Sequence, residues 1–342
     1  MRACLMLGAL LIALVAIAQP AIRGFDFAAW GPGIYRTPGS DTSLANLAAT
    51  GANWVGIVVT VYQPDRRATD IRRLPVATPT DADLRHAIAT AHRLGLKVML
   101  KPHVDLSRDD AHWRGDIGNA FTEAQWSRWF AAYTRIITGY AALARAERVE
   151  LFCVGTELEG TSGRETEWRR VIAAVRAAYG GPLVYAANWS GEAAAIRFWD
   201  ALDYLGVDAY YPLATEAGAT VAELQQGWAA GVNELAGLHA RWKKPILLTE
   251  VGFRSSAGAC REPWEWQSSP ALDLQEQANG YQATFQALWM QPWLAGLFWW
   301  DWEADLTHGG AQDRGYTPWG KPAEAIVRRY YAPAPRRCPP DS

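Results

Sequence analysis

Cysteine is scarce in this sequence, with four residues in 342, and no group of cysteines and histidines has the spacing of zinc ligands. We therefore predict neither a metal nor a cofactor. A glycine-rich phosphate loop is also missing: residues 24–27 of the first apolar run read GFDF, which disfavours a dinucleotide-binding sheet. The charges nearly balance, with 33 Lys and Arg against 35 Asp and Glu, so the composition offers no basic footprint for nucleic acid.

Long apolar runs are limited to the N-terminus, and the run found there has the features of a leader. Arg2 supplies a positive charge, residues 5–16 form an apolar stretch too short to span a bilayer comfortably, and Ala16 and Ala18 fit the small-residue rule for cleavage. We predict a signal peptide over residues 1–18 and an exported protein, periplasmic or secreted, with no stable membrane association after cleavage. An uncleaved N-terminal membrane anchor is the alternative.

The cysteines outside the leader differ in their sequence context. Cys153 lies in an apolar run and is predicted to be a buried thiol. Cys260 and Cys338 lie in loop-like sequence and are candidates for a disulfide in an oxidising compartment. Such a disulfide would hold the C-terminal tail, residues 332–342, which is rich in proline and arginine and is predicted to be loose.

Short apolar runs alternate with helical patterns over residues 19–331. The eight runs cover residues 22–27, 53–61, 96–102, 149–156, 183–188, 204–210, 246–250 and 294–300. Eight buried strand-like runs separated by helices predict an α/β fold with a single (β/α)8 TIM barrel. An open doubly wound sheet is the alternative, and the missing phosphate loop argues against it.

The connections between these runs are unequal in length. Those that lead from a helix into a strand are short, whereas those that leave a strand are long, as in residues 103–121, 252–273 and 301–320. Long loops after strands elaborate the C-terminal face of a barrel, where such proteins place their chemistry. We therefore look for functional residues at the ends of strands.

Tryptophan is abundant, with 18 residues, roughly three to four times the usual share in a globular protein. Some of these rings must lie in the core. However, tryptophan also forms half-exposed platforms with a flat face and a polar N–H, and sugar rings stack on such faces. The composition thus favours a carbohydrate cleft at the barrel mouth.

Two carboxylates stand out among several at the strand ends. Glu157 and Glu250 each follow a threonine at the end of a strongly apolar run, the fourth and the seventh. Glycoside hydrolysis needs one carboxylic acid to protonate the leaving oxygen and a second carboxylate as nucleophile or base. A single strand-end glutamate is as easily a structural ion-pair partner. Two on one barrel are less easily explained in that way, but their spacing alone does not make them a catalytic pair.

Eight segments of the chain resemble glycoside hydrolase family 113, in clan A of the retaining TIM-barrel glycosidases. The segments are residues 100–105, 113–115, 154–158, 185–189, 205–212, 249–254, 298–300 and 320–322. The family is known for β-1,4-mannanase activity, so the resemblance implies an endo-β-1,4-mannanase-like hydrolase that cleaves mannan or glucomannan by double displacement. The clan's acid/base at the end of strand four falls on Glu157, and its nucleophile at the end of strand seven falls on Glu250. The clan's pattern also implies that Tyr210 hydrogen-bonds the nucleophile.

One position departs from the wider clan, which often places an asparagine before the acid/base. Thr156 stands there, as in family 113 itself, and one contact to a sugar 2-hydroxyl is thereby lost. Asn188 or His103 could replace it. In the implied mechanism the pKa of Glu157 is raised and Glu250 is ionised.

Further residues at the mouth are predicted to hold the sugar. Only one of the adjacent Trp299 and Trp300 can floor the subsite of the reacting sugar, because neighbouring strand residues face opposite ways, and we favour Trp300. The substrate-binding candidates are His103, Asp105, Trp113, Arg114, Asn188, Trp189, Tyr210, Trp299, Trp300 and Trp302. For the four in the loop after the third run, a network that merely orders the loop is the alternative.

The predicted partner is therefore a polysaccharide or oligosaccharide substrate. Two alternatives stay open. The same chemistry could act on another β-glycan, by hydrolysis or transglycosylation. A non-catalytic carbohydrate-binding barrel would keep the tryptophans and lose a catalytic glutamate, and both glutamates are present.

Overall fold

The computed structural model describes residues 20–332, which form one closed barrel of eight parallel strands. Each strand pairs with the next in sequence, and β1 (Ile22–Ala28) closes the ring on β8 (Leu294–Glu303). The strands between them are β2 (Trp54–Gln63), β3 (Lys97–Leu106), β4 (Leu151–Thr156), β5 (Leu183–Asn188), β6 (Tyr204–Asp208) and β7 (Ile246–Val251). The predicted (β/α)8 fold is confirmed, because every expected apolar run forms a strand of this barrel.

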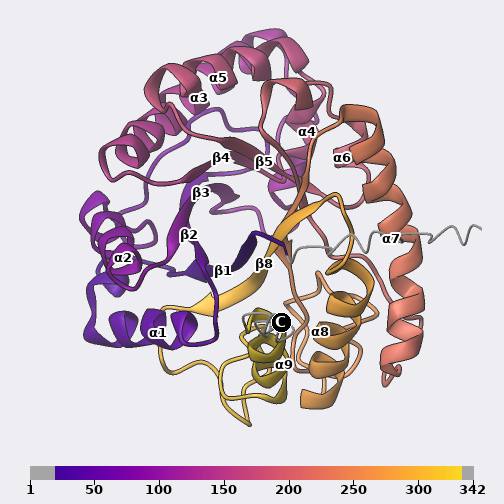
Figure 1. The fold of residues 1–342 in the computed structure, drawn as a ribbon. Helices are drawn as coiled ribbons and strands as arrows, with labels where there is room; N and C mark the ends of the chain where they lie inside the picture. The colour runs from indigo at the N-terminus through magenta and orange to yellow at the C-terminus, as the bar shows by residue number, and fades with distance from the viewer. Residues whose placement is uncertain (1–19, 333–342) are drawn as a thin grey trace, which may run out of the picture.

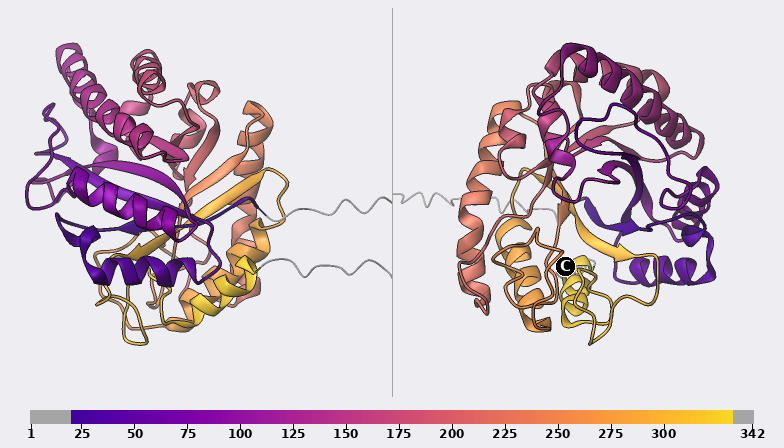
Figure 2. Two further views of the ribbon diagram at one scale, coloured as in Figure 1. Left: turned by 60° about the vertical axis from the view of Figure 1, so that its left-hand side comes forward. Right: turned by 180° about the vertical axis from the view of Figure 1, so that it is seen from behind.

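Helices surround the ring of strands (Figure 1). They are α1 (Pro38–Ala48), α2 (Asp81–Arg93), α3 (Glu123–Ala146), α4 (Glu159–Ser162), α5 (Glu165–Ala178), α6 (Glu192–Ala195), α7 (Val221–Trp242), α8 (Leu274–Leu288) and α9 (Pro322–Tyr331), with the 3-10 turns η1 (Ile34–Arg36), η2 (Arg114–Asp116) and η3 (Trp199–Ala201). The helix that follows β5 is a single turn, α6, so α7 has no long helical neighbour on that side. The described chain begins and ends on the same side of the barrel (Figure 2), where the Tyr331 hydroxyl donates to the Gly24 carbonyl.

Reciprocal capping starts three of the helices, including the two longest, α3 and α7. At the start of α3 the Thr122 side chain accepts from the backbone N–H of Gln125, and the Gln125 side chain accepts from that of Thr122. The same capping box opens α2 and α7. Each box pairs backbone N–H groups that the helix itself leaves free, and a threonine cap is worth roughly 1 kcal/mol.

The aromatic core lies between the strands and the helices and absorbs much of the tryptophan. Six tryptophans are fully buried: Trp129, Trp168, Trp199, Trp228, Trp299 and Trp302. Trp168 of α5, for example, meets Tyr185 of β5 edge-on and stacks on Phe198. Each such ring removes roughly 150–250 Å² from water, so this layer contributes heavily to stability.

The interior of the barrel is layered, and β3 shows the order of the layers. Its alternate residues point inward. Met99 joins an apolar layer with residues of six other strands. Two residues further along β3, Lys101 contacts carboxyl groups from β1, β6 and β7. The next inward-facing residues, His103 and Asp105, contact Arg114 in the loop after β3. The inner face therefore changes from apolar to ionic toward the carboxyl ends of the strands.

Three strands carry one extra residue near their carboxyl ends. Cys153 and Thr156 of β4 pair with Val184 and Ala186 of β5, so β4 has one residue more than β5 between these two pairs. In the same way β7 has one extra residue relative to β6, and β8 has one extra residue relative to β1. An extra residue in a strand re-aims the side chains that follow it. These irregularities immediately precede Glu157, Glu250 and Trp302, so simple strand alternation fails just where the mouth begins.

Some predictions fall on residues outside 20–332. The leader and Cys338 lie there, so cleavage and the Cys260–Cys338 disulfide stay predictions. Within the described chain the Cys260 thiol is buried and donates to the Glu276 carbonyl, and Cys153 is buried as expected. Between residues 20 and 332, no helix has both the length and the apolarity that crossing a bilayer requires.

Candidate active site

The two predicted catalytic glutamates reach the barrel mouth from β4 and β7. Glu157 follows β4 with a left-handed φ of 51°, and its backbone N–H donates to the Ala186 carbonyl at 2.8 Å. A non-glycine residue in this conformation costs of order 1 kcal/mol and persists only where the surroundings hold it. Glu250 lies in β7 directly after the extra residue, opposite Asp208. The two side chains are close enough that the charge on Glu250 contributes to raising the pKa of Glu157.

The surroundings of Glu157 favour its protonated form. Burial is the main cause, and it raises the pKa of Glu157 to about 7 against the opposing charge of Arg114. Arg114 Nη1 lies 3.2 Å from Glu157 Oε2. A carboxyl group that is half protonated near neutral pH can donate a proton to a leaving group and recover it from water.

The surroundings of Glu250 supply donors to a carboxylate. Lys101 Nζ lies 2.5 Å from Oε1, and the Tyr210 hydroxyl donates to Oε2 at 2.6 Å. His103 Nε2 is 3.9 Å from Oε1, and burial, with the charges of Arg114 and Lys101, lowers the pKa of His103 well below its usual value. A charged donor on one oxygen and a hydroxyl on the other hold the carboxylate in one orientation.

A layer of buried charge lies directly beneath Glu250, and sequence reasoning missed its centre. Lys101 Nζ also donates to Asp26 Oδ2 at 3.1 Å and to the Thr249 carbonyl at 2.9 Å, and lies 3.7 Å from Asp208 Oδ1. Burial raises the pKa of both aspartates well above the usual value, against the charge of Lys101. Lys101 could have been identified from the sequence, because it is a lysine at an inward-facing position of a strongly apolar strand.

The loop after β3 brings its predicted residues onto one arginine. Besides Glu157, Arg114 contacts Asp105 Oδ2 at 3.2 Å and His103 Nδ1 at 3.3 Å. The side chain of Arg114 is mostly buried and joins β3, η2 and β4. These contacts order the loop, and they leave the roles of His103 and Asp105 in sugar binding as predictions.

Two of the tryptophans predicted to bind sugar lie in the core instead. Trp299 is 0% exposed and stacks on Tyr281 of α8 with 3.8 Å between ring centroids. Trp302 is 1% exposed, packs on Phe25, and donates from its indole N–H to Ser43. Trp299 faces outward onto α8, and the extra residue that follows it in β8 turns Trp302 to the same outer face. For these two residues the prediction of sugar contact is wrong.

Trp300 stays the predicted floor of the site. Its ring is partly exposed, stacks against His103 at 6.0 Å, and has Lys101 Nζ 5.7 Å from its centroid. Trp30, which follows β1 and was not predicted, lies 6.3 Å from Trp300 and is 49% exposed. The sequence offered only the presence of a tryptophan two residues after the first strand.

Further aromatic rings extend over the rim of the mouth. Trp189, after β5, stacks on Trp264 of the loop after β7 with 5.3 Å between centroids. Trp264 is 43% exposed and Trp113, in the loop after β3, is 40% exposed. Asn188 at the end of β5 is nearly buried and donates its amide to Glu159 and Ser190. Exposed indole faces on the loops after β3 and β7 can take sugar rings.

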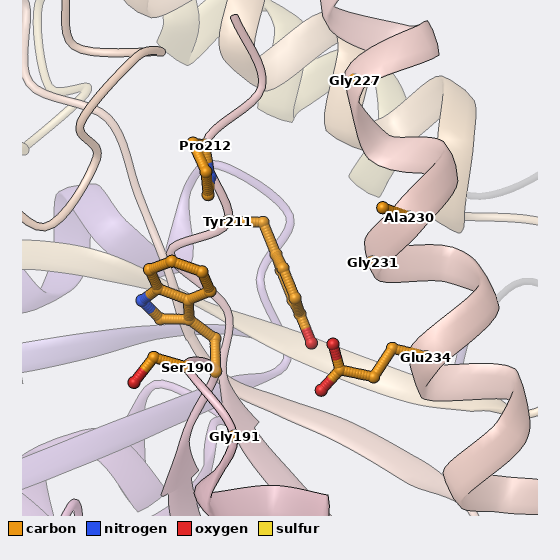
Figure 3. A pocket seen from close by; sticks show the side chains of 9 residues that line it. Ser190, Gly191, Tyr211, Pro212, Gly227, Ala230, Gly231 and Glu234 are labelled. Carbon is orange, nitrogen blue, oxygen red and sulfur yellow. The ribbon is translucent and has the colours of Figure 1, made fainter.

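A cavity of about 470 Å³ lies on the α7 side of Trp189. It is lined by Trp189, Ser190, Gly191, Tyr211, Pro212, Gly227, Ala230, Gly231 and Glu234. Figure 3 shows the Tyr211 hydroxyl turned toward the Glu234 carboxylate of α7. The cavity exists where the single-turn α6 leaves the small residues of α7 uncovered, and neither Glu157 nor Glu250 lines it.

The geometry brings together an acid whose pKa is raised to about 7, a carboxyl group held by a lysine and a tyrosine, and a partly exposed tryptophan. Over residues 20–332 no three His, Cys, Asp or Glu side chains are arranged as metal ligands. An acid and a carboxylate at the ends of the fourth and seventh strands of a (β/α)8 barrel define a TIM-barrel glycosidase.

The sequence model of Glycoside Hydrolase Family 113 matches residues 25–321, and the chain therefore belongs to this family and is a glycoside hydrolase. A solved relative is the GH113 β-mannanase of Alicyclobacillus acidocaldarius, in complex with ManMIm. It is 32% identical, with a TM-score of 0.82 over 92% of this chain and 98% of that one. A GH113 β-1,4-mannanase structure is 29% identical, with a TM-score of 0.80 over 91% of this chain and 98% of that one.

More distant structures share the fold alone. A β-glucuronidase from Ruminococcus gnavus is 14% identical, with a TM-score of 0.62 over 91% of this chain and 50% of that one. Comparison with curated proteins gives no match.

Proposed function

We propose that this protein hydrolyses β-1,4-linked mannan or glucomannan with retention of anomeric configuration. The observation that carries the proposal is the unequal surroundings of Glu157 and Glu250 at the mouth of a family 113 barrel. The substrate class is supported by the solved members of the family, which are described as β-mannanases and β-1,4-mannanases. Retention follows from the clan.

In the first step Glu250 attacks the anomeric carbon while Glu157 gives its proton to the glycosidic oxygen. The bond between the anomeric carbon and that oxygen breaks, and an ester bond to Glu250 forms. Tyr210 and Lys101 hold the attacking carboxylate in place. In the second step water attacks the same carbon, Glu157 takes the proton of the water, and the ester bond breaks.

The remaining residues of the mouth position the sugar. Trp300 offers a partly exposed face beside His103, which itself lies 3.9 Å from Glu250, so it suits the ring that reacts. Trp30 lies beside Trp300, and the stacked pair of Trp189 and Trp264 lies on the rim near β5 and β7. Aromatic faces on more than one side of the catalytic pair suit an extended polysaccharide better than a single sugar.

The test uses purified protein on β-1,4-mannan, glucomannan, xylan and β-glucans, with products sized and their anomeric configuration followed by NMR. Beside it run Glu157→Gln and Glu250→Gln, with Glu165→Gln at the start of α5 as a matched control outside the site. We expect cleavage of mannan to β-configured products, lost in the two site variants and kept in the control.

Other outcomes would redirect the proposal. Activity on a different polymer would keep the mechanism and change the substrate class. Activity that survives Glu250→Gln would remove Glu250 as the nucleophile. Binding without cleavage across the whole panel would favour the carbohydrate-binding barrel.

We also propose that the chain is exported. The proposal rests on the leader pattern of residues 1–18, with Arg2 before the apolar stretch and Ala18 at the cleavage position. Fractionated cells expressing the full chain would be assayed by intact mass and N-terminal sequencing. We expect a protein that starts at Gln19 outside the cytoplasm; a full-length chain in the membrane fraction would favour the anchor instead.

A further inference from the structure

The buried charge beneath Glu250 contains more acid than base. Lys101 is fully buried, and its three N–H donors are taken by Glu250, Asp26 and the Thr249 carbonyl, with Asp208 slightly farther away. One ammonium therefore faces three carboxyl groups. Burying two uncompensated negative charges in this interior would be strongly unfavourable, because a buried ion without a partner loses its hydration.

The hydrogen bonds show which carboxyl group receives the lysine charge. The shortest contact of Lys101 is to Glu250 Oε1, at 2.5 Å, whereas Asp26 is at 3.1 Å and Asp208 at 3.7 Å. Asp26 Oδ1 and Asp208 Oδ2 are buried without a hydrogen-bond partner in the described chain. An oxygen of a buried carboxylate without any donor is far more costly than the oxygen of a neutral acid.

The other groups around Glu250 do not change this balance. Ionisable groups from several elements face Glu250 or its lysine. They are Asp26 from β1, Lys101 and His103 from β3, Arg114 from η2, Cys153 from β4 and Glu157 just after it, Asp208 from β6 and Tyr210 just after it, Asp301 from β8 and Tyr316 from the loop after β8. Arg114 is engaged by Asp105 and Glu157, and His103 is neutral. Within residues 20–332, Lys101 is thus the cation in direct contact with Glu250.

We propose that Lys101 is a positioning residue that keeps Glu250 ionised, and that Asp26 and Asp208 are neutral acids at pH 7, so that the single lysine charge is directed to the nucleophile. This inference rests on the proposed role of Glu250. Neutral aspartates satisfy the geometry because they accept from Lys101 and Thr249 without competing for the charge. Were they ionised, Lys101 would be shared among three anions and its hold on Glu250 would weaken.

The first test is the pH profile of kcat/KM for Lys101→Met, on an aryl β-mannooligosaccharide. Removing the ammonium destabilises the carboxylate of Glu250. The acid limb of the profile, where kcat/KM rises with pH, should therefore move to higher pH by about one pH unit or more. We also expect kcat/KM at its optimum to fall roughly 100-fold, because the nucleophile is less well placed. An unmoved acid limb would overturn the proposal, and Lys101→Arg should keep the limb while lowering the rate.

A second buried lysine provides the matched control. Lys321 donates to Asp313, Ser255 and the Gly315 carbonyl and ties together the loops after β7 and β8. Lys321→Met should lower the melting temperature and leave the acid limb in place. A shift of the limb in both variants would indicate a general loss of structure and count against a specific role for Lys101.

A measurement independent of activity decides the proton positions even if Lys101→Met fails to fold. Infrared spectra at pH 7 report protonated carboxyl groups by their C=O band. Asp26→Asn and Asp208→Asn should each remove intensity from that band, whereas Asp200→Asn on the surface should not. Unchanged spectra in both would show that the aspartates are ionised and would overturn the proposal. Failure of the proposed function is distinct, because it appears as activity that survives Glu250→Gln.

Discussion

Glu157 and Glu250 follow the same residue type at the ends of two strands of one barrel, yet the structure surrounds them differently. Glu157 lies in a buried site with one arginine at 3.2 Å, and burial raises its pKa to about 7. Glu250 accepts from a buried lysine and a tyrosine at 2.5 and 2.6 Å. Two identical side chains thus lie in surroundings that suit opposite roles, and the proposed mechanism assigns one as the acid and the other as the nucleophile.

The largest effect is expected from removing the nucleophile. Glu250→Gln keeps the shape of the side chain and abolishes attack on the anomeric carbon, so kcat should fall by on the order of 10⁴-fold or more. The measurement is steady-state hydrolysis of mannan, with far-UV circular dichroism to show an intact barrel. A loss of kcat of less than tenfold would show that Glu250 is not the nucleophile, and the roles assigned to Glu157 and Glu250 would then be exchanged or withdrawn.

Glu157→Gln should have a strong but substrate-dependent effect. General acid catalysis contributes roughly 10²–10⁴-fold, and a substrate with a good leaving group needs it less. The loss of rate in the variant should therefore be large on mannan. It should be small for the first step on an activated aryl glycoside. In the wild type kcat/KM should decline as pH rises through about 7, because Glu157 loses its proton there, and the variant should lack that limb.

Tyr210→Phe breaks the contact to Glu250 and leaves Glu157 untouched. A hydrogen bond to a charged group is worth about 1.5–3 kcal/mol, so kcat/KM should fall by roughly 10- to 100-fold. The acid limb should rise slightly, since the carboxylate loses a donor. The matched control is Tyr316→Phe, because the Tyr316 hydroxyl donates to the Pro263 carbonyl instead. Its kcat/KM should fall less than that of Tyr210→Phe.

The smallest predicted effect is a shift in pH dependence from Arg114→Met. The charge of Arg114 lowers the pKa of Glu157, so its removal should raise that pKa, and the alkaline limb should move above pH 7. Arg164→Met on the outside of the barrel should leave the limb in place. A limb that moves to lower pH would contradict the assigned electrostatics of Glu157.

The fold could be predicted because its determinants are local. Each run such as residues 183–188 is apolar enough to be buried on both faces, and such strands separated by helices close into a parallel barrel. The strand-end glutamates followed from the same pattern, since the carboxyl ends of all strands share one face. The tertiary structure places Glu157 within reach of Arg114, and Glu250 within reach of Tyr210.

The tryptophans show where sequence reasoning reached its limit. Alternation along β8 would put Trp300 and Trp302 on one face, but an extra residue opposite β1 turns Trp302 outward into the core. Whether a strand gains such a residue depends on its neighbour's register. Trp30 was overlooked because nothing in its own segment reveals that it lies beside Trp300.

By itself the sequence determined the barrel, the face that carries the chemistry and the two glutamates at the strand ends, because periodicity and position along a strand are local properties. The tertiary structure alone decided that burial raises the pKa of Glu157 and that Lys101 lies beneath Glu250. The physical reason is that burial and charge act through space, and the groups that meet around Lys101 come from β1, β3, β6 and β7, far apart in the chain.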